Sequence, residues 1–280
     1  MRQFNNKVVL ITGGSSGIGQ ATALRLASFG ARVAVAARNQ DALDATVARI
    51  AERGGTGLAI QTDVTIAEQC RNAVAKTVER FGQLDILICS AGLSMRAYFE
   101  DSELPAMEQV VRVNFFGTLY ATHFALEHVK KQRGSLVSIS SLTGKRGIPS
   151  YAIYGASKYA IQGLYDALRL ELRKDGVHVG VVSPGFVDTP LRTNVLGPDG
   201  RPWSNPPPPP FRIWPVEKCV DRIVWLIARR KRQALIPWFT GPLLVLDHLL
   251  GDRIGDFILA RKFPPMHSAP GSWQGQGSQG

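Results

Sequence analysis

Tyr154 and Lys158 stand four residues apart and are the first pair whose types suggest chemistry. They lie in a stretch, 152–174, whose alanines and leucines recur at helical spacing, so both side chains project from one face of a helix. A phenol with its ordinary pKa of about 10 is a poor base at neutral pH, but a nearby ammonium stabilises the phenolate and lowers that pKa. We therefore expect one acid–base unit, although the same spacing also arises by chance.

Ser141 precedes Tyr154 by thirteen residues and follows the apolar run 136–140, which we interpret as a strand. Open parallel sheets bind ligands at the carboxyl ends of their strands. A hydroxyl at this place can hydrogen-bond a substrate oxygen. Ser140 and Thr143 offer the same group, so each of the three also fits a plain loop hydroxyl.

A glycine-rich turn, 12–19, lies between the first apolar run and a stretch with helical spacing. Glycines let the backbone turn sharply and approach a pyrophosphate, while the helix N-terminus directs unpaired N–H groups toward its oxygens. Because the spacing differs from G-x-G-x-x-G, an ordinary strand-to-helix turn is the alternative. The residues that would hold the phosphates are Gly13, Ser15, Ser16, Gly17, Ile18 and Gly19.

Arg38 follows the second apolar run, where an NAD-binding fold places an acidic residue on the ribose 2′-hydroxyl. An arginine suits a 2′-phosphate instead, since its guanidinium forms charge-assisted hydrogen bonds with phosphate oxygens. This position favours NADP(H), although a solvated arginine after a strand is a common alternative.

Short β-branched runs alternate with helical patterns, which indicates right-handed βαβ units on a parallel sheet covered on both faces. We predict an α/β fold: a doubly wound, Rossmann-type parallel sheet in a single domain, 1–240. A C-terminal helical extension, 241–263, and a disordered tail, 264–280, would follow. The expected strands are 8–11, 32–36, 58–61, 86–89, 136–140 and 178–182, with a further short apolar run at 234–236.

Four motifs occur together and in order: T-G-x-x-x-G-I-G, an I-S-S strand end, Y-x-x-x-K and S-P-G-F-V-D-T. Their joint occurrence is far more specific than any one of them. On these motifs the chain resembles the short-chain dehydrogenase/reductase family. The resemblance implies an NADP(H)-dependent oxidoreductase that moves a hydride between nicotinamide and an alcohol or carbonyl carbon, with Tyr154 as the general acid/base.

The same resemblance implies roles for residues outside the acid–base pair. Asn114 would support a water-mediated proton relay with Lys158, which would also hold the nicotinamide ribose. Where the family usually has asparagine before Ala-Gly, this chain has Ser90, so support of the central sheet is expected to differ there. The other implied cofactor contacts are Asp63 and Val64 at the adenine, Ala91 and Gly92 in the cleft, and Pro184, Gly185, Val187 and Thr189 around the nicotinamide.

The proline- and glycine-rich segment 189–215 would build the substrate pocket in such an enzyme. Its apolar side chains suit an apolar small-molecule alcohol or ketone, while packing of the loop onto the domain is the alternative reason for them. Ring ketones, retinoid-like molecules and acyl chains all stay open as substrates. The apolar residues are Leu191, Val195, Leu196, Trp203, Phe211, Ile213 and Trp214.

Residues 242–260 form an apolar segment that Asp247, Asp252 and Asp256 interrupt. It is too short and too charged to span a bilayer. Its leucines recur at helical spacing, so we expect one amphipathic helix that packs on the domain, on a second subunit or peripherally on a membrane. Beside such a helix, the basic run 229–232 could meet anionic lipid.

The charge balance of 33 basic and 22 acidic residues, +11 in net charge, favours anionic partners without choosing among nucleotides, lipids and nucleic acids. Nucleic acid is not expected, because no helix-turn-helix, zinc or RNA-binding signature occurs. The three scattered cysteines predict neither a disulfide framework nor a metal site. The N-terminus does not resemble a signal peptide, so we expect a cytoplasmic protein, in which peripheral membrane contact stays open.

The family resemblance further implies a homodimer or homotetramer that pairs helices at 105–131 and 152–174. The alternative function is a catalytically silent NADP-binding regulatory or scaffold protein with the same fold. The presence of Ser141, Tyr154 and Lys158 argues against that alternative.

Overall fold

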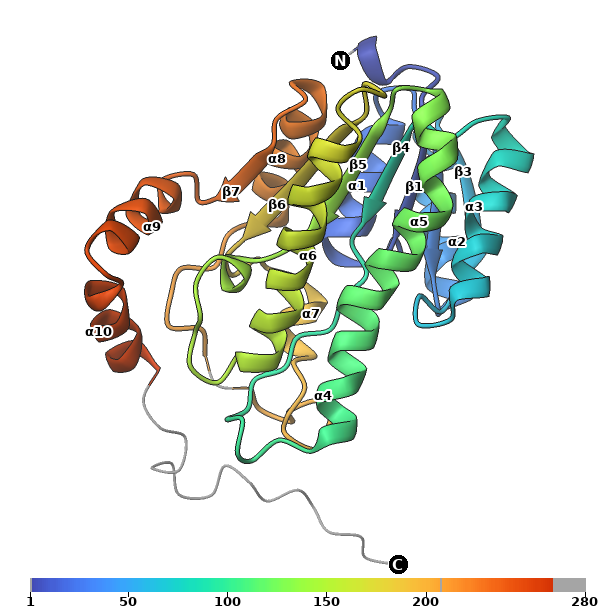
Figure 1. The fold of residues 1–280 in the computed structure, drawn as a ribbon. Helices are drawn as coiled ribbons and strands as arrows, with labels where there is room; N and C mark the ends of the chain where they lie inside the picture. The colour runs from blue at the N-terminus through green and yellow to red at the C-terminus, as the bar shows by residue number, and fades with distance from the viewer. Residues whose placement is uncertain (1, 207, 264–280) are drawn as a thin grey trace, which may run out of the picture.

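The sheet at the centre of the computed structural model has seven parallel strands (Figure 1). The structure describes residues 2–206 and 208–263. The strand order is β3-β2-β1-β4-β5-β6-β7, so strands are added in opposite directions on the two sides of β1 and β4. The predicted doubly wound sheet is confirmed. Its strands are β1 (Val8–Thr12), β2 (Arg32–Ala37), β3 (Thr56–Gln61), β4 (Ile86–Cys89), β5 (Ser135–Ile139), β6 (His178–Pro184) and β7 (Gln233–Ile236).

Helices cover both faces of the sheet, as the two-sided apolar strands predicted (Figure 1). Along β1, Val9 and Ile11 contribute to one apolar cluster, whereas Val8 and Leu10 contribute to the other, because successive side chains of a strand point to opposite faces. One cluster includes residues of α1 (Gly17–Ala27), α2 (Gln40–Ala51) and α8 (Val216–Ala228). The other includes residues of α3 (Ala67–Phe81), α5 (Gly117–Lys131) and α6 (Ala152–Glu171).

The helical stretch predicted at 105–131 is divided by one π-helical turn. It begins as α4 (Leu104–Val111), passes through the π-helical turn Arg112–Phe116 and continues as α5. Such turns are rare and often occur at functional sites. Here the turn contains Asn114, one of the predicted site residues.

The loops at the carboxyl edge contain two further short helices. A 3₁₀ turn, Leu142–Gly144, follows β5, and α7 (Pro190–Thr193) lies in the long connection between β6 and α8. These loops lie at the edge where the strand order reverses, which is where open α/β sheets bind ligands.

The C-terminal extension contains two helices, so the prediction of one helix over 242–260 is wrong. They are α9 (Thr240–Leu249) and α10 (Arg253–Lys262). Between them Gly251 and Asp252 have φ values of 71° and 61°, which an α-helix does not accommodate. Glycine directly after the C-cap commonly ends a helix in this way, and this is the physical reason for the break.

The basic run 229–232 lies at the amino edge of the sheet, away from α9. Arg230 donates to the carbonyls of Arg133 and Gly176, which precede β5 and β6, and Arg232 pairs with Asp166 of α6. The expectation that this run lies beside the C-terminal apolar stripe is therefore wrong, because β7 separates the two. Among the described residues no helix is long and apolar enough to cross a membrane. The predicted disordered tail, 264–280, lies outside the described residues.

Candidate active site

A cavity of about 1740 Å³ lies along the carboxyl edge of the sheet, and the loops after all seven strands contribute to its lining. Pockets for one drug-sized ligand measure about 300–1000 Å³, so this cavity has room for a dinucleotide and a second molecule. Among the predicted site residues, Gly19 and Asn114 lie outside its lining. The others line it: Gly13, Ser15, Ser16, Gly17, Ile18, Arg38, Asp63, Val64, Ser90, Ala91, Gly92, Ser141, Tyr154, Lys158, Pro184, Gly185, Val187 and Thr189.

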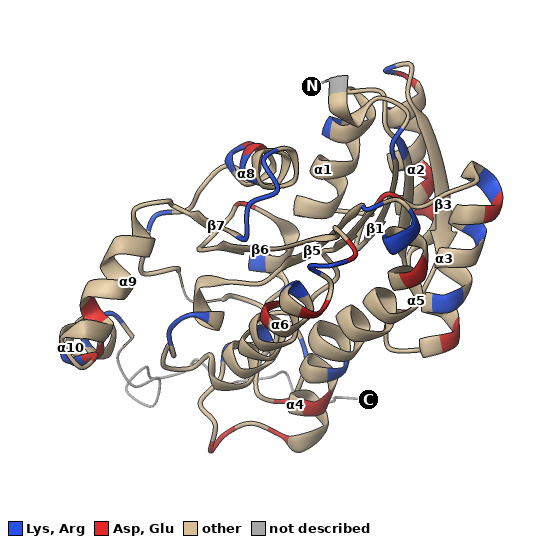
Figure 2. Cartoon of the chain, turned by 45° about the horizontal axis from the view of Figure 1, so that its top comes forward, with Lys and Arg blue, Asp and Glu red and all other residues tan. Residues whose placement is uncertain are grey.

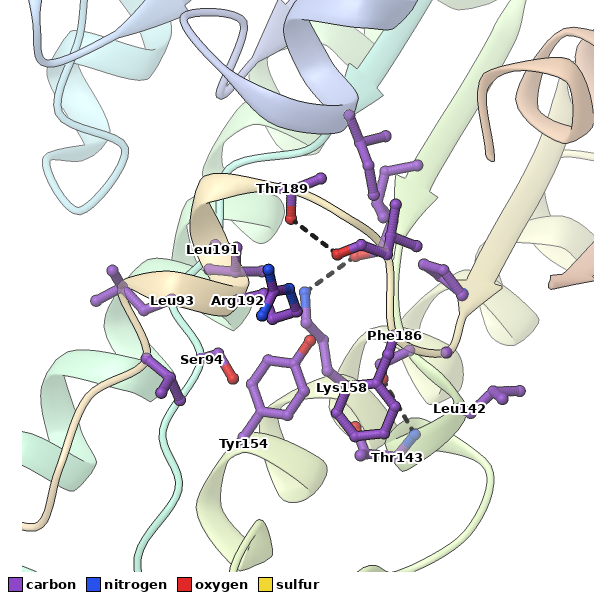
Figure 3. A pocket seen from close by; sticks show the side chains of 18 of the residues that line it. Leu93, Ser94, Leu142, Thr143, Tyr154, Lys158, Phe186, Thr189, Leu191 and Arg192 are labelled. Carbon is purple, nitrogen blue, oxygen red and sulfur yellow. Dashed lines mark hydrogen bonds between the residues drawn. The ribbon is translucent and has the colours of Figure 1, made fainter. Parts of the chain in front are cut away.

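Tyr154 and Lys158 project into the cavity from the first turns of α6 (Figure 3). The Lys158 Nζ lies 5.7 Å from the centroid of the Tyr154 ring. It donates a hydrogen bond of 3.0 Å to the carbonyl oxygen of Ile139, the last residue of β5. The end of this strand therefore positions the ammonium beside the phenol.

Burial shifts both groups of this pair. It raises the pKa of Tyr154 to about 12, although a hydrogen bond with Ser141 lowers it, and it lowers the pKa of Lys158 to about 8. Desolvation of the phenolate is the largest effect on the pKa of Tyr154 and outweighs its hydrogen bond with Ser141. That a neighbouring ammonium lowers this pKa during the reaction stays a prediction. At neutral pH the Tyr154 phenol keeps its proton and the Lys158 amine is mostly protonated. The pair therefore consists of a proton donor beside a positive charge.

The three hydroxyls near Tyr154 differ in what they already bond. Ser140 Oγ donates to the Lys158 carbonyl oxygen at 3.0 Å and so ties β5 to α6. Ser141 hydrogen-bonds Tyr154 and accepts from the Thr143 backbone N–H at 3.1 Å. Thr143 Oγ1 is buried, and no described residue bonds it, although Thr143 also lines the cavity. Ser141 is thus the hydroxyl beside the phenol, and Thr143 retains an unused one.

Asn114 is fully buried behind the cavity wall, where its side chain holds two segments together. Its Oδ1 accepts from the Leu93 N–H at 2.7 Å, and its Nδ2 donates to the Leu93 carbonyl at 3.0 Å and to Ser157 Oγ at 2.9 Å. A Cβ on Gly92 would lie 3.2 Å from Asn114 Oδ1 and 3.5 Å from Lys158 Nζ. The amide therefore fixes the loop after β4 close to the ammonium.

The glycine turn after β1 has the form of a phosphate cradle. Gly13 has a φ of 71°, and a Cβ there would lie 2.6 Å from the Ala91 nitrogen, while a Cβ on Gly19 would lie 2.2 Å from the Gly13 oxygen. Only glycine fits either position. The Ser16 side chain does not cap α1, so the first N–H groups of this helix stay available to an anion. These residues fit the pyrophosphate of a dinucleotide.

Arg38 lies one residue beyond β2 with an exposed side chain on the cavity wall. None of the described acidic residues forms an ion pair with it. Asp63 uses one carboxylate oxygen, Oδ1, within its own turn, where it accepts from the Thr65 N–H at 2.9 Å and the Thr65 hydroxyl at 2.7 Å. This end of the cavity therefore offers the Arg38 cation, in a lining that also contains Asp41 and Asp63.

Ser90 occupies the position where the family usually has asparagine. At this position, hydrogen bonds from backbone N–H groups link the ends of β1 and β4. The Ser90 N–H donates to the Thr12 carbonyl at 3.1 Å, and the Ala91 N–H donates to the Thr12 hydroxyl at 3.4 Å. Thr12 thus joins the ends of β1 and β4.

The comparisons with known proteins agree with this geometry. Residues 7–198 match the family described as short chain dehydrogenase. This chain belongs to that family. It is 39% identical over 231 residues to "11-beta-hydroxysteroid dehydrogenase-like 4A" of Arabidopsis thaliana, a match that covers 82% of this chain and 76% of the relative. The resemblance predicted from the motifs is confirmed.

Two solved structures share the fold. A dehydrogenase/reductase from Sinorhizobium meliloti 1021 superposes with a TM-score of 0.73 at 29% identity, covering 82% of this chain and 93% of that one. Levodione reductase gives a TM-score of 0.73 at 25% identity, covering 83% and 96%. The chain is therefore an oxidoreductase of a family that uses a nicotinamide cofactor, NAD or NADP.

The other end of this short-chain dehydrogenase's cavity is apolar. Trp203 and Ile213 lie outside the lining, and Trp203 instead donates its indole N–H to the Arg96 carbonyl at 3.1 Å. From the predicted substrate loop, the residues in the lining are Leu191, Val195, Leu196, Phe211 and Trp214. The C-terminal helices add Leu243, Leu246, Leu250, Ile254 and Ile258.

Sequence reasoning missed the residues that attach the C-terminal helices to this end of the short-chain dehydrogenase. Phe263, just after α10, is buried, and its ring centroid lies 6.1 Å from that of Tyr151, which in turn lies 6.2 Å from that of Tyr154. Arg146, in the loop after β5, pairs with all three aspartates of the extension. The sequence offered one indication of this attachment: three aspartates in an otherwise apolar segment require a partner of opposite charge.

Proposed function

We propose that the protein is an NADP(H)-dependent oxidoreductase that interconverts an alcohol and a carbonyl on an apolar small molecule. The observation that carries the proposal is the position of Tyr154: it lies in one cavity between a glycine cradle and apolar walls, with Ser141 bonded to it and Lys158 one turn away. When bound, the nicotinamide would supply or accept the hydride.

The residues of this chain would handle the oxygen and its proton. In the direction of carbonyl reduction, Ser141 donates a hydrogen bond to the carbonyl oxygen and Tyr154 transfers its proton to that oxygen. Lys158 stabilises the phenolate that remains, because a positive charge beside a phenolate favours the ionised form. In alcohol oxidation the proton moves the other way. The family resemblance adds that Lys158 also holds the nicotinamide ribose and that Asn114 supports the proton relay behind it.

Arg38 supports NADP(H) as the cofactor. Its guanidinium is exposed on the cavity wall and is not paired with a described acid, so it can bind a 2′-phosphate. The cradle of Gly13, Gly17 and Gly19 would receive the pyrophosphate at the N-terminus of α1.

The apolar half of the cavity supports an apolar substrate. Residues of the substrate loop and of α9 and α10 surround it, and Thr143 offers an additional hydroxyl for a polar group on the ligand. Since several Arabidopsis relatives bear the name 11-beta-hydroxysteroid dehydrogenase, a rigid ring alcohol or ketone of that kind is the first class to test.

The test is a screen of the purified full chain against ring ketones, retinoid-like aldehydes and long-chain ketones and alcohols. Turnover is measured as absorbance of NADPH at 340 nm, with Tyr154→Phe as the inactive control. We expect turnover with at least one apolar class and none with the control. Tight NADPH binding without turnover of any class would favour the silent scaffold alternative.

A further inference from the structure

The C-terminal extension exposes large apolar side chains, on α9, on α10 and just before α9, that do not line the cavity. Trp238, Val245, Leu249 and Phe257 are 71%, 61%, 76% and 59% exposed, and we call these four residues the outer face. The two helices project from the body of the molecule, and neither contains a buried residue (Figure 1). Exposed apolar residues gathered on one element mark a surface that another body covers.

The acidic residues of this segment are held by one arginine. Arg146 lies 3.4 Å from Asp247, 3.4 Å from Asp252 and 2.7 Å from Asp256, and it also donates to the Asp252 carbonyl. The three aspartates, which argued against a bilayer-spanning segment, therefore pair with the loop after β5. In Figure 2, α9 is almost free of charged residues apart from one acidic position near its end.

Three basic residues of the segment form no ion pair with any described acidic residue. Arg253, Arg261 and Lys262 are exposed, and no described residue forms an ion pair with them. The Arg261 guanidinium lies 4.4 Å from the centroid of the Phe257 ring, so a cation stands directly beside an apolar ring of the outer face. Apolar side chains with adjacent unpaired cations are the composition of a peripheral contact with anionic lipid.

We propose that α9 and α10 dock peripherally on a membrane surface that contains anionic phospholipid. The acyl chains would cover Trp238, Leu249 and Phe257, and the headgroup phosphates would pair with Arg261 and Lys262. A second copy of this face is a poorer occupant, because two copies would bring like charges together.

The same helices connect this face with the cavity. Leu243, Leu246, Leu250, Ile254 and Ile258 line the cavity and are also exposed. An apolar substrate dissolved in the lipid would therefore reach the cavity along these side chains without crossing water. This entry route rests on the proposed function, whereas the docking does not.

The test is co-sedimentation of the full chain with vesicles of phosphatidylcholine alone and of an equimolar mixture with phosphatidylglycerol. We expect binding to the anionic vesicles only, weakened by salt, with a blue shift of tryptophan emission that Trp238→Phe removes. Phe257→Glu should lower the vesicle affinity about tenfold or more. The matched control is Phe99→Glu, since Phe99 is 63% exposed and is followed by Glu100 and Asp101.

Three results would overturn the docking: no binding to anionic vesicles, equal binding by wild type and Phe257→Glu, or equal loss in Phe99→Glu. If Phe257→Glu instead lowers the mass in light scattering without vesicles, the face is a subunit contact and the proposal is wrong. NADPH affinity, measured without lipid, checks that each variant is folded. Turnover of a water-dispersed substrate tests the proposed function separately.

Discussion

The Arg146 guanidinium lies 2.7 Å from the Asp256 carboxylate and so joins the loop after β5 to α10. The Asp247 carboxylate, which the same arginine contacts, also accepts the Gly255 N–H at 2.7 Å and ties α9 to α10. One cation therefore holds both C-terminal helices over the apolar end of the cavity. Phe263, just after α10, packs on Tyr151, so the same attachment places an aromatic ring against the start of α6.

Replacing Arg146 with glutamine should loosen α9 and α10. Loss of hydrogen bonds to charged groups costs about 1.5–3 kcal/mol, so we expect the KM for a bulky apolar substrate to rise by about tenfold or more. NADPH affinity should stay within about twofold, because the cradle lies at the other end of the cavity. Steady-state kinetics and hydrogen exchange over 240–263 measure the two effects. Arg173→Gln is the matched control, since that exposed arginine forms no ion pair with a described residue; an equal rise of KM in this control would contradict the role of Arg146.

Tyr154→Phe should reduce kcat by about 10²-fold to 10⁴-fold, the range typical for loss of a general acid. Cofactor affinity should hardly change, because only the phenolic oxygen and proton are lost. Lys158→Met should reduce both turnover and cofactor affinity, since the family resemblance implies that this ammonium serves both the phenol and the ribose. Stopped-flow turnover and fluorescence titration with NADPH distinguish the two variants. Substantial turnover by Tyr154→Phe would remove the phenol from the reaction.

Arg38→Asp should reverse the cofactor preference. The variant loses a charge-assisted bond to the 2′-phosphate, about 1.5–3 kcal/mol, and gains an acid that suits a free 2′-hydroxyl. We expect NADPH affinity to fall about 10-fold to 100-fold and NADH affinity to rise. Dissociation constants for both cofactors, measured on wild type and variant, give the answer. Equal affinities of the wild type for NADPH and NADH would show that Arg38 does not discriminate between the two cofactors.

His178 should make the fold sensitive to mild acid. Burial at the amino end of β6 lowers its pKa to about 4, against an ordinary value of about 6.5 in the unfolded chain. Below pH 6.5 the unfolded chain therefore gains a proton that the folded chain does not bind until about pH 4, so the free energy of unfolding falls over this window. The expected fall is about 2 kcal/mol between pH 7 and pH 5. Urea unfolding at both pH values measures it, and His178→Gln should lose about that much of the wild-type pH dependence.

Light scattering should give the mass of a homodimer or homotetramer in lipid-free buffer, as the family resemblance implies. The expected contact involves the outer faces of α5 and α6, where Tyr159 and Leu170 are exposed. Leu170→Glu should then lower the mass. A monomer across micromolar concentrations would contradict this prediction.

Local patterns in the sequence determined much of the fold and the reactive centre. The apolar runs at 8–11 and 86–89 became buried strands, and the glycine turn before α1 adopted a shape that only glycine permits. Tyr154 and Lys158 face the same cavity because four-residue spacing on a helix aligns two side chains. These features depend on neighbours within a few residues, which is why the sequence by itself was sufficient for them.

Tertiary structure decided the rest, because it depends on which distant segments meet. Burial among packed elements raises the pKa of Tyr154 and outweighs its hydrogen bond with Ser141. The three C-terminal aspartates pair with Arg146, more than a hundred positions away in the chain, and so attach the segment to the loop after β5. The basic run 229–232 is near α9 in sequence, yet β7 places it at the opposite edge of the sheet. Ion pairing and desolvation follow from distances through space, and only the folded chain defines those distances.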